Sequence, residues 1–185
     1  MIYAIISDIH GNLEALESVL RDAEKNKAER YICLGDLVGY GASPKECIEK
    51  IKSLRDVVCA GNHDHAATNQ TDTTYFNLYA RKAVAWTISQ LTPSDIDYIK
   101  SFPYIYEDKL FCAVHANLIK PEQWGYIFDD FDAFPNFAAM KQNICFIGHS
   151  HVPLAFEKGD DIRPYYNMRE IQIQENKQYI INVGS

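Results

Sequence analysis

The sequence predicts a single α/β domain over residues 1–185, built around a parallel sheet. Apolar residues make up 47% of the chain and charged residues 23%, which are the proportions of an ordinary globular domain. Three short apolar segments alternate with two segments of helical periodicity in the first 60 residues. Strands that alternate with helices favour a parallel sheet with right-handed crossovers.

The first half of the chain follows this alternation closely. A nearly continuous apolar run at 2–7 predicts a strand that is covered on both faces. Asn12 is a suitable N-cap for the helix that follows. Residues 31–34 predict the second strand, and 43–46 form a capping box with Pro at the first helical position. The third strand is expected at 56–60.

The middle of the chain is less regular. Residues 66–90 are rich in Thr, Asn and Tyr and then become helical through Tyr75, Leu78, Tyr79, Val84 and Trp86. Thr92 begins a further helix. We expect the segment 66–100 to form a candidate lid or cap.

The second half predicts mainly strands. They are expected at 104–106 and 110–114, which form a hairpin, and at 144–147, 153–158, 169–174 and 178–183. The segment 116–142 between them is irregular and aromatic, and it either packs in the core or forms a second lid. If it is a lid, Trp124 or Tyr126 contacts a nucleobase.

Composition excludes several classes of protein. With 18 Lys and Arg against 25 Asp and Glu, the net charge is −7, whereas a protein that coats nucleic acid needs a basic face. No apolar run is long enough to cross a membrane, and the apolar start has no basic region typical of a signal peptide. The five cysteines are scattered without a C-x-x-C pair. We therefore expect a cytoplasmic protein with reduced thiols.

Polar side chains follow five of the expected strands, where each strand ends. They are Asp8, His10, Asp36, Asn62, His63, His115, His149 and His151. Ligands bind beyond the carboxyl ends of strands in open α/β sheets, so these residues are expected on one edge. Imidazoles with carboxylates and an amide oxygen suit Mn, Fe, Zn, Co or Ni rather than calcium. Two such ions about 3.5–4 Å apart can hold a phosphoryl group between them.

These motifs resemble the calcineurin-like metallophosphoesterase superfamily. Asp8-Ile9-His10, Gly35-Asp36, Gly61-Asn62-His63-Asp64, His115 and Gly148-His149-Ser150-His151 stand in the order of that family. The segment 35–41, followed by Pro44, is similar to its bacterial and archaeal YfcE-like or diadenosine-tetraphosphatase-like branch. The resemblance implies a four-layer α/β/β/α sandwich of two mixed sheets.

The resemblance also implies a role for each site residue. Asp8, His10 and His151 would hold one divalent metal ion, and Asn62, His115 and His149 a second, with Asp36 as the bridge between them. Manganese is the expected metal, with Fe, Zn, Ni, Co or Mg as alternatives. A metal-bridging hydroxide would attack phosphorus. His63 would donate a proton to the leaving oxygen or stabilise its charge, oriented by Asp64, while His65 is expected to be structural or solvent-exposed.

The implied activity is hydrolysis of a small phosphomonoester, phosphodiester or nucleotide polyphosphate. Gly39-Tyr40 stands where eukaryotic-type protein phosphatases of this superfamily carry an Asp-Arg pair, which argues against protein phosphatase activity. Two alternatives remain: a member that keeps the fold as a protein-interaction scaffold, and a nuclease of the same superfamily.

The family pattern usually continues beyond a segment similar to 182–185. We therefore expect the second sheet to be truncated at its C-terminal edge, and an unpaired edge to favour a homo-oligomer.

Overall fold

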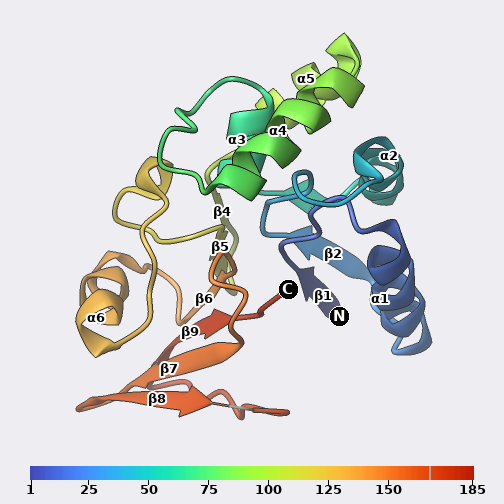
Figure 1. Ribbon diagram of the computed structural model, residues 1–185. Helices are drawn as coiled ribbons and strands as arrows, with labels where there is room; N and C mark the ends of the chain where they lie inside the picture. Colours follow the sequence, from blue (N-terminus) through green and yellow to red (C-terminus); the bar gives the residue numbers. More distant parts are fainter. Residues whose placement is uncertain (167) are drawn as a thin grey trace.

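The computed structural model describes residues 1–166 and 168–185 and has two β-sheets packed face to face between helices (Figure 1). The smaller sheet is parallel throughout, in the order β1 (Tyr3–Ile6), β2 (Arg30–Cys33) and β3 (Val57–Val58). Helices α1 (Leu13–Lys25) and α2 (Pro44–Leu54) connect these strands. The predicted βαβαβ unit is thus confirmed.

The larger sheet is mixed and has the order β4-β5-β6-β9-β7-β8. The strands are β4 (Ile105–Glu107), β5 (Cys112–Val114), β6 (Ile144–Ile147), β7 (Leu154–Lys158), β8 (Ile162–Tyr166) and β9 (Gln178–Asn182). Strands β4 and β5 form the expected hairpin, and β5, β6 and β9 run parallel to one another.

Three hydrophobic clusters separate the four layers. One lies between the small sheet and helices α1 and α2, one between the two sheets, and one between the large sheet and α6 (Asp130–Ala139). Strand alternation divides the side chains, so that Ala113 points into the space between the sheets while Cys112 and Val114 point toward α6. The α/β/β/α sandwich is therefore the observed fold.

Three further helices lie beyond the ends of the strands, at the top of Figure 1. They are α3 (Asn62–Ala67), α4 (Leu78–Gln90) and α5 (Pro93–Lys100). Thr92 begins α5 as expected, and it caps the helix in a capping box with Asp95. Asn12 likewise caps α1 by accepting a hydrogen bond from the Ala15 N–H at 3.1 Å.

Several local predictions are wrong. Ser43 precedes α2 but makes no side-chain capping bond. The strand expected at 169–174 is absent, and β8 pairs instead at 162–166, where an edge strand accommodates Pro164. The segment 116–142 contains α6 and a short 3-10 helix, η1 (Pro121–Gln123), so it is less irregular than expected.

The aromatic residues that suggested the helix at 75–86 are not its buried face. Tyr75 precedes α4, and Leu78, Tyr79 and Trp86 are exposed. The helix packs instead through Ala80, Val84 and Thr87. Small residues on α4 therefore make its contact with the domain, and the aromatic rings remain available at the surface.

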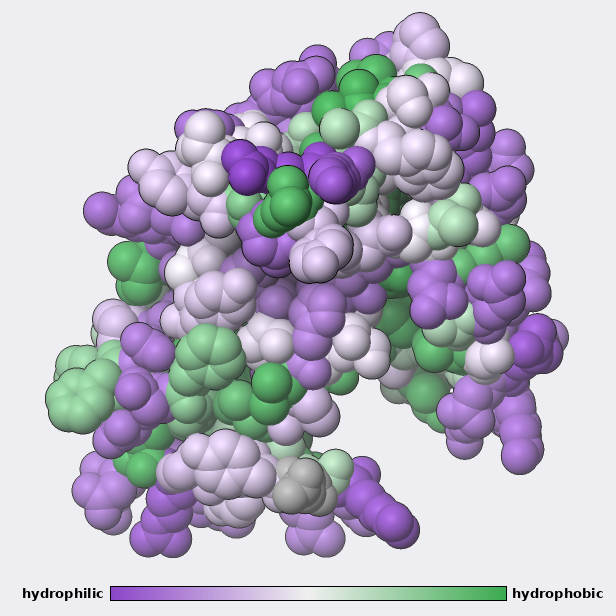
Figure 2. Space-filling model, in the orientation of Figure 1, coloured by the Kyte–Doolittle hydropathy of each residue, from purple (hydrophilic) through white to green (hydrophobic). Residues whose placement is uncertain are grey.

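The last strand is not an edge of the larger sheet. β9 lies between β6 and β7 and is paired on both sides, so the edges of this sheet are β4 and β8. The C-terminal strand is thus internal to the sheet, and homo-oligomerisation through one of the sheet edges stays a prediction. Figure 2 shows the surface notched between the part around β7 and β8 and the part around α1. No helix of the described residues is long and apolar enough to span a membrane.

Candidate metal centre

The candidate metal centre lies where strands of both sheets end. Asp8 and His10 follow β1, and Asp36 follows β2. His115 directly follows β5, whereas His149 and His151 follow β6. Parallel strands end at the same side of a sheet, and face-to-face packing brings the two rims together. The structure therefore gathers residues that are up to 143 positions apart in the chain.

Five of these residues have a left-handed backbone, which is uncommon for residues other than glycine. Their φ angles lie between 50° and 65°, for Asp8, His10, Asp36, His149 and His151. Such conformations cost about 1–3 kcal/mol each and persist where surrounding contacts impose them, often at functional sites. The tight turns aim consecutive side chains at one point beyond the strands.

A first group consists of Asp8, His10 and His151, with one ligand atom of each within 4.8 Å of the others. The Nε2 atoms of His10 and His151 lie 3.1 Å apart. His10 donates its Nδ1–H to the Val38 carbonyl at 3.2 Å. Because a carbonyl only accepts, this bond places the proton of the neutral ring on Nδ1 and leaves Nε2 as the ligand atom.

A second group consists of Asp36, His115 and His149, again within 4.8 Å. The fully buried His115 ring donates Nδ1–H to the Leu34 carbonyl at 3.1 Å. Its Nε2 atom lies 3.1 Å from Asn62 Oδ1 and 3.4 Å from Asp36 Oδ2. Asn62 thus faces the same point as this group. His10 Nε2 of the first group is 3.6 Å from Asp36 Oδ2, so Asp36 lies between the two groups.

His63 also lies at the centre of the site. One of its ring nitrogens falls within 4.8 Å of ligand atoms of His10 and Asp36. Its backbone N–H donates to Asp36 Oδ1 at 2.8 Å, which fixes the start of α3 against that carboxylate. Gly39 makes room for the ring, because a Cβ there would lie 2.5 Å from His63 Nδ1.

Asp64 does not orient the His63 ring by a hydrogen bond, contrary to the expectation from sequence. Its two carboxylate oxygens accept from the backbone N–H groups of Val38 and Gly61, at 3.2 and 3.1 Å. His63 Nδ1 is buried and has no hydrogen-bond partner. Asp64 therefore holds two loops of the site together through these backbone groups.

Two further observations fit a bound metal ion. Among the described residues, His149 Nε2 is buried without a hydrogen-bond partner, and Asp8 Oδ1 is buried with the candidate ligand His151 beside it, its Nε2 at 3.1 Å; buried polar atoms normally have a hydrogen-bond partner. The other oxygen, Asp8 Oδ2, accepts from Ser7 Oγ at 2.6 Å and from the His149 N–H at 3.0 Å. Gly148 admits this carboxylate, because a Cβ there would lie 2.5 Å from Asp8 Oδ2. The mixed imidazole and carboxylate donors suit a divalent transition metal.

The pKa values of the histidines in the site shift in opposite directions. Burial opposes the charge of His115, but the facing Asp36 carboxylate outweighs burial and raises the pKa of His115 to about 9. Burial lowers the pKa of both His63 and His149 to about 4. Burial and the nearby charge of Asp36 raise the pKa of Asp64 to about 7. The two carboxylates with facing histidines, Asp8 and Asp36, have pKa values below the usual range despite their burial.

Aromatic rings surround these candidate ligands, and of those named here the sequence indicated only Tyr126 as a possible contact of the substrate. Tyr40 packs against His10 and His63, with ring centroids 4.8 and 4.6 Å apart, and Phe76 lies 4.9 Å from His63. Tyr126 stacks on His149 at 4.2 Å. The sequence signal that could have indicated Tyr40 is its position directly after Gly39. Nothing in the local sequence pattern indicates that Phe76 belongs to the site.

His65 is buried in α3 rather than exposed in a loop. Its ring lies 5.0 Å from that of Tyr104 and 5.2 Å from that of Trp124. It takes part in none of the ligand groups found among the described residues. This agrees with the structural role expected for it.

Two cavities open beside the ligands, one on each side of Tyr40. The larger, of about 510 Å³, is lined by Asn62, His63 and His149 together with residues of the segments 71–80 and 122–126. The smaller, of about 450 Å³, is lined by Asp8, His10 and His151 together with residues of 9–14 and 41–43. Both predicted lid segments therefore contribute walls to the larger cavity.

Comparison with known proteins adds an independent line of evidence. The sequence profile of the calcineurin-like phosphoesterases matches residues 1–182. The chain is 38% identical to protein MJ0912 of Methanocaldococcus jannaschii, over 98% of this chain and 74% of that protein. The crystal structure of a metallophosphoesterase from Sphaerobacter thermophilus superposes with a TM-score of 0.85 at 36% identity, covering 99% of this chain and 76% of that one.

A shorter similarity concerns a symmetrical bis(5′-nucleosyl)-tetraphosphatase from Psychromonas ingrahamii. It is 41% identical over 64 residues, which are 32% of this chain and 23% of that enzyme.

Proposed function

This chain belongs to the calcineurin-like phosphoesterase family, and from that premise we propose that it hydrolyses small phosphate esters with two divalent metal ions. Membership in this metal-dependent family implies a phosphoric ester hydrolase. The observation that carries the dinuclear proposal is the presence of two ligand groups on either side of one carboxylate, Asp36.

The proposed ligands follow from the groups described above. Asp8, His10 and His151 would hold one ion, and Asn62, His115 and His149 the other, with Asp36 between them. Two divalent cations in such a site supply Lewis-acid chemistry, which neutralises phosphoryl charge and makes water a nucleophile at neutral pH. Manganese is the metal that we propose, with Fe, Zn, Ni, Co or Mg as alternatives.

The remaining residues of the site would position the substrate and the leaving group. His63 lies on the floor of the larger cavity and next to Asp36, so its ring can reach an oxygen that leaves toward that cavity. It would donate a proton to this oxygen or stabilise its charge. Asp64 would act indirectly, by holding the loops at Val38 and Gly61. The substrate would be a phosphomonoester, a phosphodiester or a nucleotide polyphosphate.

Hydrolysis of p-nitrophenyl phosphate and of bis(p-nitrophenyl) phosphate with added Mn²⁺ tests the proposal. We expect turnover that requires metal, with about two metal ions per chain. His63→Ala should lower kcat about 10²–10⁴-fold, as for loss of a general acid, with unchanged metal content. His65→Gln, in the same helix, is the matched control and should retain turnover. A metal-loaded protein that is inert toward every phosphate ester would refute the proposed function.

A further inference from the structure

The larger cavity has two walls from distant parts of the chain. One wall comes from the segment before α4 and its first turn, with Thr71, Tyr75 and Phe76, and the other from the segment 122–126. Its floor consists of Asn62, His63 and His149. A group that leaves phosphorus on the side of His63 would therefore enter this cavity.

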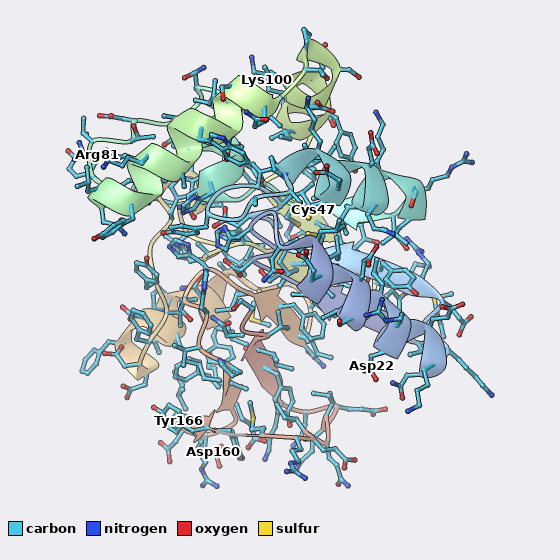
Figure 3. The ribbon with its side chains drawn as sticks, turned by 45° about the vertical axis from the view of Figure 1, so that its right-hand side comes forward. Asp22, Cys47, Arg81, Lys100, Asp160 and Tyr166 are labelled. Carbon is cyan, nitrogen blue, oxygen red and sulfur yellow. The ribbon has the colours of Figure 1, made fainter. Side chains whose placement is uncertain are left out.

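The walls of this cavity carry negative charge. Asp72 and Glu122 both line it, and the hydroxyl and N–H of Thr74 hold the pKa of Asp72 below its usual range, so that it is anionic. Among the residues that the structure describes, the lining includes no Lys or Arg. Arg81 follows the lining residue Ala80 on α4 but is not part of the lining, and Figure 3 labels it at one end of that helix.

Aromatic rings and uncharged polar side chains make up much of the remaining lining of the cavity. Tyr75 is 94% exposed and has no aromatic partner among the described residues, so both faces of its ring are free. Tyr126 is less available, because its ring already stacks on His149 at 4.2 Å and on Phe128 at 5.1 Å. The side chains of Thr71, Asn77 and Gln123 add uncharged hydrogen-bonding groups. A ring bound in this cavity would therefore stack on Tyr75 and would meet the edge of the Tyr126 ring.

We propose that this cavity binds the leaving group of the substrate and selects an uncharged ring, such as a nucleoside or a phenol, over a phosphate chain. This inference rests on the proposed function and narrows its substrate class. In hydrolysis, water adds its oxygen to phosphorus, the ester P–O bond breaks, and the leaving oxygen takes up one proton. An ester of an alcohol thus releases a neutral molecule into the cavity.

A polyphosphate behaves differently in the same step. Cleavage of its anhydride bond releases a phosphorylated anion, which would enter a cavity with two carboxylates and no cationic side chain in its lining. The carboxylates of Asp72 and Glu122 would repel such an anion inside the cavity, even though water screens the charges. The cavity therefore argues against dinucleoside polyphosphates and nucleoside diphosphates as preferred substrates.

The test compares two kinds of leaving group on the metal-loaded full chain. AMP releases neutral adenosine, whereas ADP and diadenosine tetraphosphate release phosphorylated groups. We expect kcat/KM for AMP to exceed that for either of the other two substrates at least about 10-fold. Glu122→Lys should shrink this ratio at least about 5-fold, and the same charge change at Glu24→Lys, on the exposed surface of α1, should leave it unchanged.

Binding provides a readout that is independent of turnover. Adenosine, titrated into the metal-free protein by calorimetry, should bind, and Tyr75→Ala should weaken its affinity about 10-fold, the size expected for loss of one stacked base. The matched control is Tyr166→Ala, on β8 at the opposite end of the molecule from α4 (Figure 3).

The outcomes separate the two proposals. Failure to hydrolyse any phosphate ester overturns the proposed function and this inference with it. Ester hydrolysis with equal or better use of ADP or diadenosine tetraphosphate overturns the inference alone. So does a ratio that Glu122→Lys leaves unchanged, or adenosine binding that is absent or insensitive to Tyr75→Ala.

Discussion

Gly148→Ala should remove metal from the site by displacing one carboxylate. Gly148 has no left-handed backbone, so alanine meets no conformational penalty there and acts only through its added methyl group. That methyl would overlap Ser7 Oγ, which must turn away, and it would lie 2.5 Å from Asp8 Oδ2. Ordinary van der Waals contact begins near 3.4 Å, so the carboxylate must move by about 0.9 Å.

A shift of this size disrupts both hydrogen bonds to Asp8 Oδ2, from Ser7 at 2.6 Å and from the His149 N–H at 3.0 Å. Overpacking of a buried site costs about 1–3 kcal/mol. In a domain of this length, 2 kcal/mol lowers Tm by about 4–8 °C. Because Asp8 is a proposed ligand, affinity for one metal ion should fall at least about 10–100-fold, the loss reported for disturbing residues that support a ligand.

Two measurements check this prediction. Thermal unfolding of the metal-free protein gives the stability cost, and metal analysis after dialysis gives the number of bound ions. Gly159→Ala is the matched control, because a Cβ there meets nothing nearer than Lys177 Cε at 3.8 Å. If Gly148→Ala still binds two ions with wild-type affinity, Asp8 does not hold metal in the way that we propose.

Three further outcomes are expected. Phe137→Ala, at a ring 1% exposed in α6, should cost about 3–5 kcal/mol in denaturant unfolding, whereas Phe131→Ala, 83% exposed on the same helix, should change stability by less than about 0.5 kcal/mol. Asp56 accepts hydrogen bonds from Arg30 and from backbone N–H groups of β2 and β3. Burial opposes the charge of Asp56, but these bonds hold its pKa below the ordinary value of 3.8. The stabilisation that Asp56 gives the folded state is therefore present above pH 3.8 and is lost as the pH falls through the lower pKa of the folded state. Asp56→Asn should accordingly destabilise by about 1–2 kcal/mol at pH 7, and its difference from wild type should vanish in acid; a constant difference down to pH 2 would contradict the linkage. Saturation with Mn²⁺ at about 100 times its Kd should stabilise the folded chain by about 2.7 kcal/mol for each ion bound, seen as a higher Tm that EDTA reverses.

The sequence by itself determined the elements with strong local signals and the composition of the site. Asn12 and Thr92 cap helices as their neighbours indicate, and the apolar runs of the first half form parallel strands. The candidate ligands could be named because each follows a strand, and the carboxyl ends of parallel strands meet at one edge of a sheet. Periodicity and capping are local properties, so they can be read from consecutive residues.

Tertiary structure decided what depends on contact between distant segments. Both the central place of β9 and the pairing of β8 instead of 169–174 depend on strand partners far away in the chain. The left-handed backbone of Asp8 and His149 is imposed by their surroundings, since neither residue type prefers it strongly enough to predict it. The ring of Tyr126 stacks on Phe128 and His149, which come from different parts of the chain, and the free faces of Tyr75 follow from α4 packing through smaller residues. Sequence patterns record which side chains a segment carries, whereas the directions in which they point are set by close packing of the whole domain.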